Sequence, residues 1–277
     1  MVLVTGATGN VGRSVVEQLL AAGQPVRAMT RDPGRARFPS GVAVVRGDMA
    51  QPATLPAALE GVDRAFLFPA GVTALLEAAR GGPLRRVVLM SSAAVAMGGD
   101  NAIARGHAPQ EEAVRRSGLE WILLRPGAFM VNDLAWAAQI RDGVVRAPFG
   151  DASSAPIDER DIAAVAVRAL LADDLVGQAP ILTGPESLTV AERVRILGEV
   201  LGRAIRFVEM TPAEARRAMG HMPPALVETL LGFAAASVGR PAPVADTVAA
   251  VTGRPATPYR AWADRHRGAF GGEGLAP

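Results

Sequence analysis

Short apolar runs alternate with longer segments of helical periodicity through the first half of the chain. The runs are the mostly hydrophobic stretches at 2–4, 26–29, 42–45, 65–68, 87–90 and 121–124. Between the first two, Val11, Val15 and Leu19 recur at helical spacing, and Gly23 ends the pattern. Apolar strands separated by helices are typical of a parallel sheet covered on both faces. The pattern therefore predicts an α/β fold with a doubly wound parallel sheet.

The second half of the chain shows helix-start signals in place of regular apolar runs. Two capping boxes begin at Thr189 and Thr211, each with a glutamate three residues later. Asp158 precedes a segment with acidic residues in its first turn, which favours a helix start there. Prolines interrupt the chain beyond residue 222. These signals predict a smaller, mainly helical C-terminal lobe.

The change from regular apolar runs to helix-start signals predicts a domain boundary near residue 184. We expect a first domain over 1–184, within which 131–156 contributes to the second lobe. The second lobe is expected over 185–277. The tail from about residue 268 is expected to be disordered.

A glycine-rich loop follows the first apolar run. Residues 4–12 read VTGATGNVG, which contains the pattern G-x-x-G-x-x-G. Gly6 permits a tight turn, Gly9 lets the backbone approach a pyrophosphate, and Gly12 lets the next helix pack close to the sheet. Phosphates would lie at the helix N-terminus, where unpaired N–H groups favour negative charge. Such a pattern alone can be a simple turn, but a strand before it and a helix after it favour a Rossmann-type dinucleotide site.

The residues after the second and third runs bear on which dinucleotide binds. Thr30 and Arg31 offer a hydroxyl and a guanidinium that suit a 2′-phosphate, where NAD-binding folds usually place a carboxylate. NADP is therefore favoured over NAD, although Asp32 follows directly and a solvated Arg31 is the alternative. Asp48 is placed either to contact the adenine or to cap a helix.

Further motifs occur in order along nearly the whole chain, to about Phe270. They are GATGNVG at 6–12, GDM at 47–49, SS at 91–92, SGLEW at 117–121, LRPG at 124–127, IDERDIA at 157–163 and LTGPE at 182–186. Together with Arg31, they resemble the NmrA-like, atypical short-chain dehydrogenase/reductase family. That family includes NAD(P)H-dependent quinone and azo-type reductases and also redox-sensing regulators. The resemblance implies a Rossmann domain that binds NADP and a C-terminal substrate lobe that closes over the nicotinamide end.

The resemblance also implies roles for single positions. The pyrophosphate would contact Gly6, Thr8, Gly9, Asn10 and Val11, the 2′-phosphate would contact Arg31, and the adenine would contact Asp48 and Met49. Pro69 and Ser91 would lie along the ribose. The loop from Pro126 to Phe129 would lie near the nicotinamide.

The catalytic positions depart from those of the wider superfamily. Standard members protonate a carbonyl oxygen with a tyrosine activated by a lysine four residues later, together with a serine. This chain has no lysine, and its one tyrosine, Tyr259, lies near the C-terminus. About where that tyrosine would fall stands His107, with Glu111 four residues later on the same helix face. An imidazole held by Glu111 would donate a proton near neutral pH.

His107 and Ser91 are therefore the candidate catalytic residues. For His107, a contact to cofactor or substrate and a structural or surface position are the alternatives. Ser91 would stabilise an oxyanion, or else its hydroxyl caps the following turn.

Composition narrows the classes of function. The 277-residue chain has no cysteine, all 29 basic residues are arginine, and the net charge is only +2. The absence of cysteine excludes disulfides and thiolate chemistry and fits a reducing cytoplasm. An aromatic content of 4% provides no stacking platform for nucleic acid. Neither His221 nor His266 has a partner at metal-ligand spacing, so we expect no metal.

No stretch reaches the roughly 18 uninterrupted apolar residues of a membrane span. The nearest, Ala225–Val238, is interrupted by Glu228 and is expected to be a buried or interface helix. We expect a cytoplasmic protein with a small-molecule substrate and no nucleic-acid or membrane partner. A homodimer is an open option.

Three functions fit these observations. The leading hypothesis is an NADPH-dependent oxidoreductase that reduces a small, apolar, electron-poor substrate such as a quinone, azo compound or conjugated carbonyl. A non-enzymatic NADP-binding redox sensor would explain the absent tyrosine–lysine pair directly. A natural-product tailoring enzyme, such as a cyclase, isomerase or dehydratase, is the third alternative.

Overall fold

A computed structural model describes residues 1–98 and 100–271 of the chain. Within them, seven strands form one parallel sheet in the order β3-β2-β1-β4-β5-β6-β9. The strands are β1 (Val2–Val4), β2 (Val26–Thr30), β3 (Val42–Arg46), β4 (Arg64–Leu67), β5 (Arg86–Met90), β6 (Glu120–Pro126) and β9 (Ile181–Leu182). The chain winds outward from β1 in both directions and reverses between β1 and β4. The predicted doubly wound parallel sheet is confirmed.

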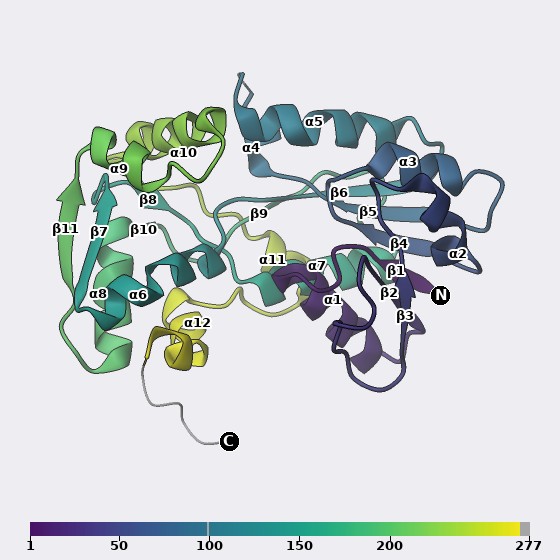
Figure 1. Cartoon of the computed structure of the whole chain (residues 1–277), viewed down its shortest axis with the longest axis horizontal. Coiled ribbons are helices and arrows are strands. Elements are labelled where there is room, and N and C mark those ends of the chain that lie inside the picture. Colours follow the sequence, from purple (N-terminus) through teal and green to yellow (C-terminus); the bar gives the residue numbers. More distant parts are fainter. Residues whose placement is uncertain (99, 272–277) are drawn as a thin grey trace.

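Helices cover both faces of this sheet (Figure 1). One face packs against α1 (Asn10–Ala21), α7 (Glu159–Leu171) and α11 (Thr247–Thr252), and the other against α2 (Leu55–Leu59), α3 (Val72–Ala78) and α5 (Ala102–Arg115). In β1, Val2 and Val4 belong to the first core and Leu3 to the second. Because successive side chains of a strand point to opposite faces, an all-apolar strand needs cover on both sides.

A smaller lobe lies beside the sheet domain, at the other end of the long axis (Figure 1). Its helical segments are η2 (Met130–Trp136), α6 (Ala137–Arg141), α8 (Val190–Leu201), α9 (Pro212–Ala218), α10 (Pro224–Ser237), α12 (Tyr259–Arg265) and η3 (Arg267–Phe270). Short helices η1 (Pro52–Thr54) and α4 (Ala93–Ala96) lie in loops of the sheet domain. The predicted helical C-terminal region is therefore present.

The smaller lobe also contains strands that the sequence analysis missed. β7 (Val144–Pro148) runs parallel to β11 (Arg206–Met210), and β8 (Ser153–Ser154) runs antiparallel to β10 (Leu188–Thr189). Each strand is short and its partner is distant in the chain, so the local sequence pattern does not predict the pairing.

The chain crosses between the two lobes more than once. After β6 it enters the smaller lobe through η2 and β7, returns through α7 and β9, and leaves again. Near its end, α11 packs against α7 of the sheet domain. The division at residue 184 stays a prediction, and the contacts of α11 show that part of 185–277 belongs to the core of the sheet domain.

The acidic first turn of α7 holds the C-terminal segment. Asp161 accepts hydrogen bonds from the Arg254 guanidinium at 2.8 Å and from the Thr257 backbone N–H at 2.6 Å. Asp158 caps α7 and also pairs with Arg265. Both carboxylates are fully buried. The IDERDIA motif therefore joins the end of the chain to the sheet domain.

The end of the described chain is ordered further than the sequence predicted. Residues Arg267–Phe270 form η3, and the Phe270 side chain is buried beside Trp262, with ring centroids 6.1 Å apart. The predicted disorder from residue 268 is therefore wrong for these residues, because an aromatic contact holds them. Residues 272–277 lie outside the described residues.

One narrow side of α10 is buried, through Val227 and Leu231. The helix meets the start of α5, where the Ala102 backbone N–H donates to Thr229 Oγ1 at 3.0 Å. In the described part of the chain, no helix has the length and apolar character needed to cross a bilayer.

The close packing of the backbone at Gly184 can be tested against Gly106, a glycine with open space around it. A Cβ at Gly184 would lie 1.9 Å from the Pro156 carbonyl oxygen, whereas the same position at Gly106 in α5 meets nothing within 4 Å. We expect Gly184→Ala to lower the free energy of unfolding by about 2 kcal/mol, because the backbone must shift. Gly106→Ala should raise it by about 0.5 kcal/mol through helix propensity. Urea denaturation of both variants measures the difference, and equal stabilities would contradict the close approach.

Candidate active site

A cleft of about 900 Å³ opens at the carboxyl ends of the strands, where the winding reverses between β1 and β4. Ligands of open α/β sheets bind at this point. Most residues predicted to contact the cofactor line this cleft: Gly6, Thr8, Gly9, Asn10, Val11, Arg31, Asp48, Met49 and Phe129. The fold therefore brings together residues from four separate stretches of the sequence.

The glycine loop leaves its backbone open to the cleft. Gly6 has a φ of +60°, which L side chains rarely adopt. A Cβ at Gly12 would lie 2.2 Å from the Gly6 carbonyl oxygen, so only glycine lets α1 start this close to the loop. Gly9 caps α1 without a side chain, which leaves the N–H groups of the first turn available to an anion. These residues fit the pyrophosphate of a dinucleotide.

Two arginines follow β2 at the cleft. The Asp32 carboxylate accepts a hydrogen bond from the Gly34 N–H at 3.1 Å, and the Arg35 N–H donates to the Asp32 carbonyl at 3.3 Å. This turn returns Arg35 to the cleft that Arg31 lines. Sequence reasoning missed Arg35, although the Asp-Pro-Gly turn before it was a readable signal.

The Asp48 carboxylate is engaged in a turn after β3 and caps no helix among the described residues. It caps its own turn by accepting hydrogen bonds from the Ala50 N–H at 3.0 Å and the Gln51 side chain at 3.2 Å. The residue also lines the cleft, beside Met49. Its contact with an adenine stays a prediction.

The end of the cleft near β5 and β6 is mainly apolar. Phe68, Met90, Phe129 and Val131 line it, together with the amide of Asn132. The predicted contacts Pro69, Ser91 and Pro126 fall outside the described residues that line the cleft, although each lies within three residues of one that does. Their roles stay predictions.

Ser91 and Glu111 belong to a buried polar network beside this end. The Ser91 hydroxyl donates to Glu111 Oε1 at 2.5 Å, and Arg125 donates to both Glu111 oxygens at 2.9 and 2.6 Å. Arg115 adds a further hydrogen bond to Glu111 at 2.9 Å. Because Glu111 is fully buried, these donors satisfy a carboxylate that water does not reach.

The predicted pairing of His107 with Glu111 is wrong. His107 Nδ1 lies 2.8 Å from the Ile103 carbonyl oxygen of its own helix, so the ring donates to the backbone there. The forked guanidinium of Arg125 pairs with the Glu111 carboxylate instead, since it donates to both carboxylate oxygens at once. Catalytic roles for His107 and Ser91 stay predictions.

The network keeps Glu111 ionised. Burial by itself raises the pKa of Glu111, but hydrogen bonds from Arg125 and Ser91 and the charges of Arg125 and Arg115 outweigh it. The pKa of Glu111 therefore lies below its ordinary value. Near neutral pH this side chain accepts hydrogen bonds and has no proton to donate.

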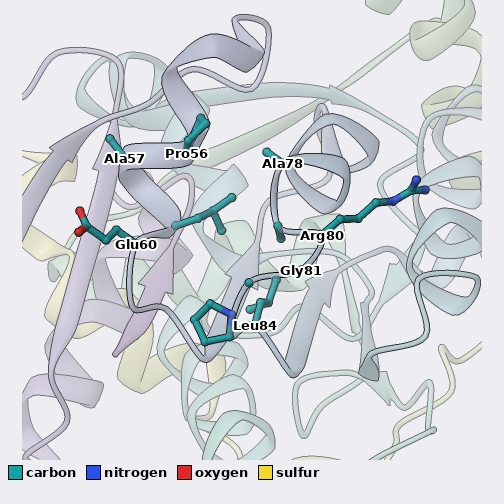
Figure 2. Close-up of a pocket in the computed structure, with 11 residues that line it drawn as sticks. Pro56, Ala57, Glu60, Ala78, Arg80, Gly81 and Leu84 are labelled. Atoms are coloured by element: carbon teal, nitrogen blue, oxygen red, sulfur yellow. The ribbon is translucent and has the colours of Figure 1, made fainter.

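A second hollow, of about 530 Å³, lies between the ends of α2 and α3. Pro56, Ala57, Ala78, Gly81 and Leu84 form much of its wall. Figure 2 shows the charged groups of Glu60 and Arg80 on opposite sides of this hollow, pointing away from one another. Without converging polar groups it has no feature that recognises a nucleotide, so the cleft at β1 and β4 is the candidate active site.

Comparison with known proteins identifies the family. A protein family described as NAD(P)H-binding matches residues 6–173. The chain belongs to this NAD(P)H-binding family. Its motifs and relatives place it in the NmrA-like, atypical short-chain dehydrogenase/reductase group, as the sequence predicted.

Relatives of this NAD(P)H-binding protein extend over its whole length. It is 43% identical to (4-alkanoyl-5-oxo-2,5-dihydrofuran-3-yl)methyl phosphate reductase of Streptomyces griseus, over 99% of this chain and 100% of that protein. It is 38% identical to NAD(P)H azoreductase of Xenophilus azovorans, over 98% and 99%. The structure of the NADPH-dependent quinone oxidoreductase QOR2 of Escherichia coli is similar, with a TM-score of 0.82 and 25% identity over 96% of this chain and 99% of that one.

The buried network predicts a pH-dependent stability. Glu111→Gln should lower the free energy of unfolding at pH 7 by about 3 kcal/mol, because Arg125, whose side chain is 16% exposed, loses the charge of its buried partner. The lowered pKa of Glu111 contributes stability above the ordinary glutamate pKa of about 4.3, and this contribution is lost as pH falls through the folded-state pKa. The difference between wild type and variant should therefore narrow in acid.

The neighbouring Glu112 is the matched control. Its exposed pair with Arg116 should contribute less than about 0.5 kcal/mol. Urea denaturation at several pH values measures the free energy of unfolding of Glu111→Gln and of Glu112→Gln and so distinguishes the two variants. Indistinguishable variants would contradict a structural role for the buried carboxylate.

Proposed function

We propose that the protein is an NADPH-dependent reductase of a small, apolar, electron-poor substrate. The observation that carries the proposal is the division of one cleft. A glycine loop and two arginines line one part, and apolar side chains with the Asn132 amide line another. Membership of an NAD(P)H-binding family and two full-length relatives named as reductases support it.

Each part of the cleft has a role in this proposal. Gly6, Gly9 and the first turn of α1 would hold the pyrophosphate, and Arg31 and Arg35 would hold the 2′-phosphate. The chemistry that a bound nicotinamide supplies is hydride transfer. Met90 and Phe129 would help to exclude water from that transfer, since both line the cleft.

The substrate class follows from the missing tyrosine–lysine pair. In a conjugated carbonyl, a quinone or an azo compound, hydride adds to an electron-poor atom and the displaced electron pair moves onto oxygen, carbon or nitrogen. Water that reaches the cleft can then supply the proton, so no strong acid has to be held in the site. The name of the Streptomyces relative describes an unsaturated lactone that is conjugated to an alkanoyl group and also carries a methyl phosphate, so that relative's substrate is anionic outside its conjugated part. We therefore place conjugated carbonyl compounds first.

The preference for NADPH over NADH is testable at two arginines. We expect Arg31→Ala and Arg35→Ala each to weaken NADPH binding by about tenfold or more, because each loses a charge-assisted hydrogen bond to phosphate. NADH affinity should change by less than about twofold, since NADH lacks that phosphate. Fluorescence titration with both nucleotides measures the two constants.

Arg80→Ala, at the hollow between α2 and α3, is the control and should bind NADPH as wild type does. Equal losses for NADPH and NADH in the two cleft variants would reject the assignment of the 2′-phosphate. A loss confined to Arg80→Ala would move the nucleotide to the other hollow.

Turnover is tested with a panel of acceptors. Purified protein with NADPH and an unsaturated lactone, a quinone or an azo dye should consume NADPH in proportion to the substrate reduced. Absorbance of NADPH and analysis of the product measure the two sides of this balance. Tight binding without consumption would favour the redox-sensor alternative, and an altered product without net consumption would favour a tailoring enzyme.

A further inference from the structure

The segment after β6 alternates between the cleft and the core of the smaller lobe. Phe129, Val131 and Asn132 line the cleft, whereas Met130 and Asp133 are 1% and 4% exposed. Met130 packs in the apolar core of the smaller lobe. The position of the cleft wall at its substrate end therefore depends on what holds Asp133 in that core.

Asp133 is held by donors from two different helices. Arg193 of α8 donates to its two oxygens at 2.6 and 2.7 Å. The Tyr259 hydroxyl of α12 donates to Asp133 Oδ2 at 2.6 Å. The Tyr259 backbone N–H donates to Glu186 at 2.9 Å, which holds the start of α12. Two helices that are distant in the sequence therefore converge on η2.

Neighbouring rings limit how far these groups can move. The Arg193 guanidinium lies over the Trp136 ring, 5.2 Å from its centroid. The Tyr259 ring is 5.5 Å from that of Trp262, and Tyr259 is fully buried. Water cannot replace a lost partner in such surroundings, so a displaced Asp133 would leave a buried charge unpaired.

We propose that Tyr259 and Arg193 are positioning residues for the substrate end of the cleft. They act through Asp133 on Val131 and Asn132, and this role rests on the reductase function proposed above. An apolar anchor tolerates small sliding movements, whereas a carboxylate with three short hydrogen bonds has one arrangement that satisfies all of them. The wall that faces the substrate is thereby held in one place, and the nucleotide end is not involved.

Tyr259 has a different task from the catalytic tyrosine of the wider superfamily. Its hydroxyl is buried and already donates to Asp133, so it is not presented to a substrate. Removing only this hydroxyl changes the anchor while the ring and the Asp133–Arg193 pair remain.

Tyr259→Phe is therefore the test variant. We expect its kcat/KM for the best acceptor of the panel to fall about tenfold, since small misplacements of substrate are costly in turnover. Its Kd for NADPH should stay within about twofold of wild type, because Arg31 and the glycine loop are untouched. Steady-state kinetics and nucleotide titration give the two values.

Thr252→Val is the matched control. At the end of α11, the Thr252 hydroxyl lies 2.7 Å from the Val248 carbonyl and 3.2 Å from the Arg254 carbonyl, and it makes no hydrogen bond to η2 among the described residues. It should lower Tm by an amount similar to Tyr259→Phe and leave kcat/KM unchanged. If both variants lose the same fraction of kcat/KM, Tyr259 supports stability alone and the positioning role is overturned.

A spectroscopic measurement tests the anchor without turnover. Tyr259 is the one tyrosine of the chain, so tyrosinate absorbance reports this side chain alone. Burial and the Asp133 charge outweigh the opposing charge of Arg193 and raise the pKa of Tyr259 well above its ordinary value. The neutral hydroxyl should therefore persist above pH 10 until the protein unfolds. An ionisation near pH 10 in protein that is still folded by circular dichroism would overturn the proposal.

The outcomes separate the two proposals. Wild-type protein that turns over no acceptor rejects the reductase function and the positioning role that rests on it. Wild-type turnover with an unchanged kcat/KM in Tyr259→Phe rejects the positioning role alone.

Discussion

A buried carboxylate must find a hydrogen-bonding or cationic partner, and the assembly of this protein follows from where those partners lie. The chain has no lysine, so its cationic side chains apart from three histidines are arginines, whose planar guanidinium can satisfy two carboxylate oxygens together. Buried acids and arginines from distant segments form these pairs: Glu111 with Arg125, Asp133 with Arg193, Asp158 with Arg265, and Asp161 with Arg254. The pairs join α5 to β6, η2 to α8, and α7 to the C-terminal segment. The first two pairs hold elements together within a lobe, and the two pairs of α7 fasten the C-terminal segment to the sheet domain.

The cleft differs from these buried pairs in how its arginines are partnered. Arg31 and Arg35 line it, and among the described residues neither guanidinium is tied to a carboxylate, unlike Arg125 and Arg193. The first turn of α1 likewise begins at a glycine that offers no capping side chain. Positive charge and unpaired N–H groups are thus left facing one space, which is the arrangement that an anionic ligand needs. Structural pairs satisfy these buried carboxylates, whereas Arg31 and Arg35 share the nucleotide end of the cleft with Asp32 and Asp48, and among the described residues no ion pair ties either guanidinium.

His107 and Glu111 show the limit of reasoning from spacing. Residues four apart on a helix do face the same side, and the pairing was physically sound on that ground. The carboxylate also faces Arg125 and Ser91, which come from the ends of β6 and β5 and offer better hydrogen-bond geometry. Likewise, the acids of IDERDIA are favourable in a first helical turn, as the sequence indicated, but their oxygens also hold Arg254 and Arg265. A local sequence pattern identifies only partners that are near in the chain. It does not identify partners that the fold brings close from distant segments.

The sequence by itself determined the parallel sheet, the glycine loop and the family. These depend on apolar periodicity, on glycine where a side chain would collide, and on motifs of contiguous residues. Only the tertiary structure decided that β7 pairs with β11, that Arg35 reaches the cleft, that Phe270 is buried, and that Tyr259 holds η2 through Asp133. Each of these depends on a contact between residues far apart in the chain, or on the path of a turn. Such contacts are chosen by competition among all available partners in three dimensions, and that competition leaves no periodic trace in the sequence.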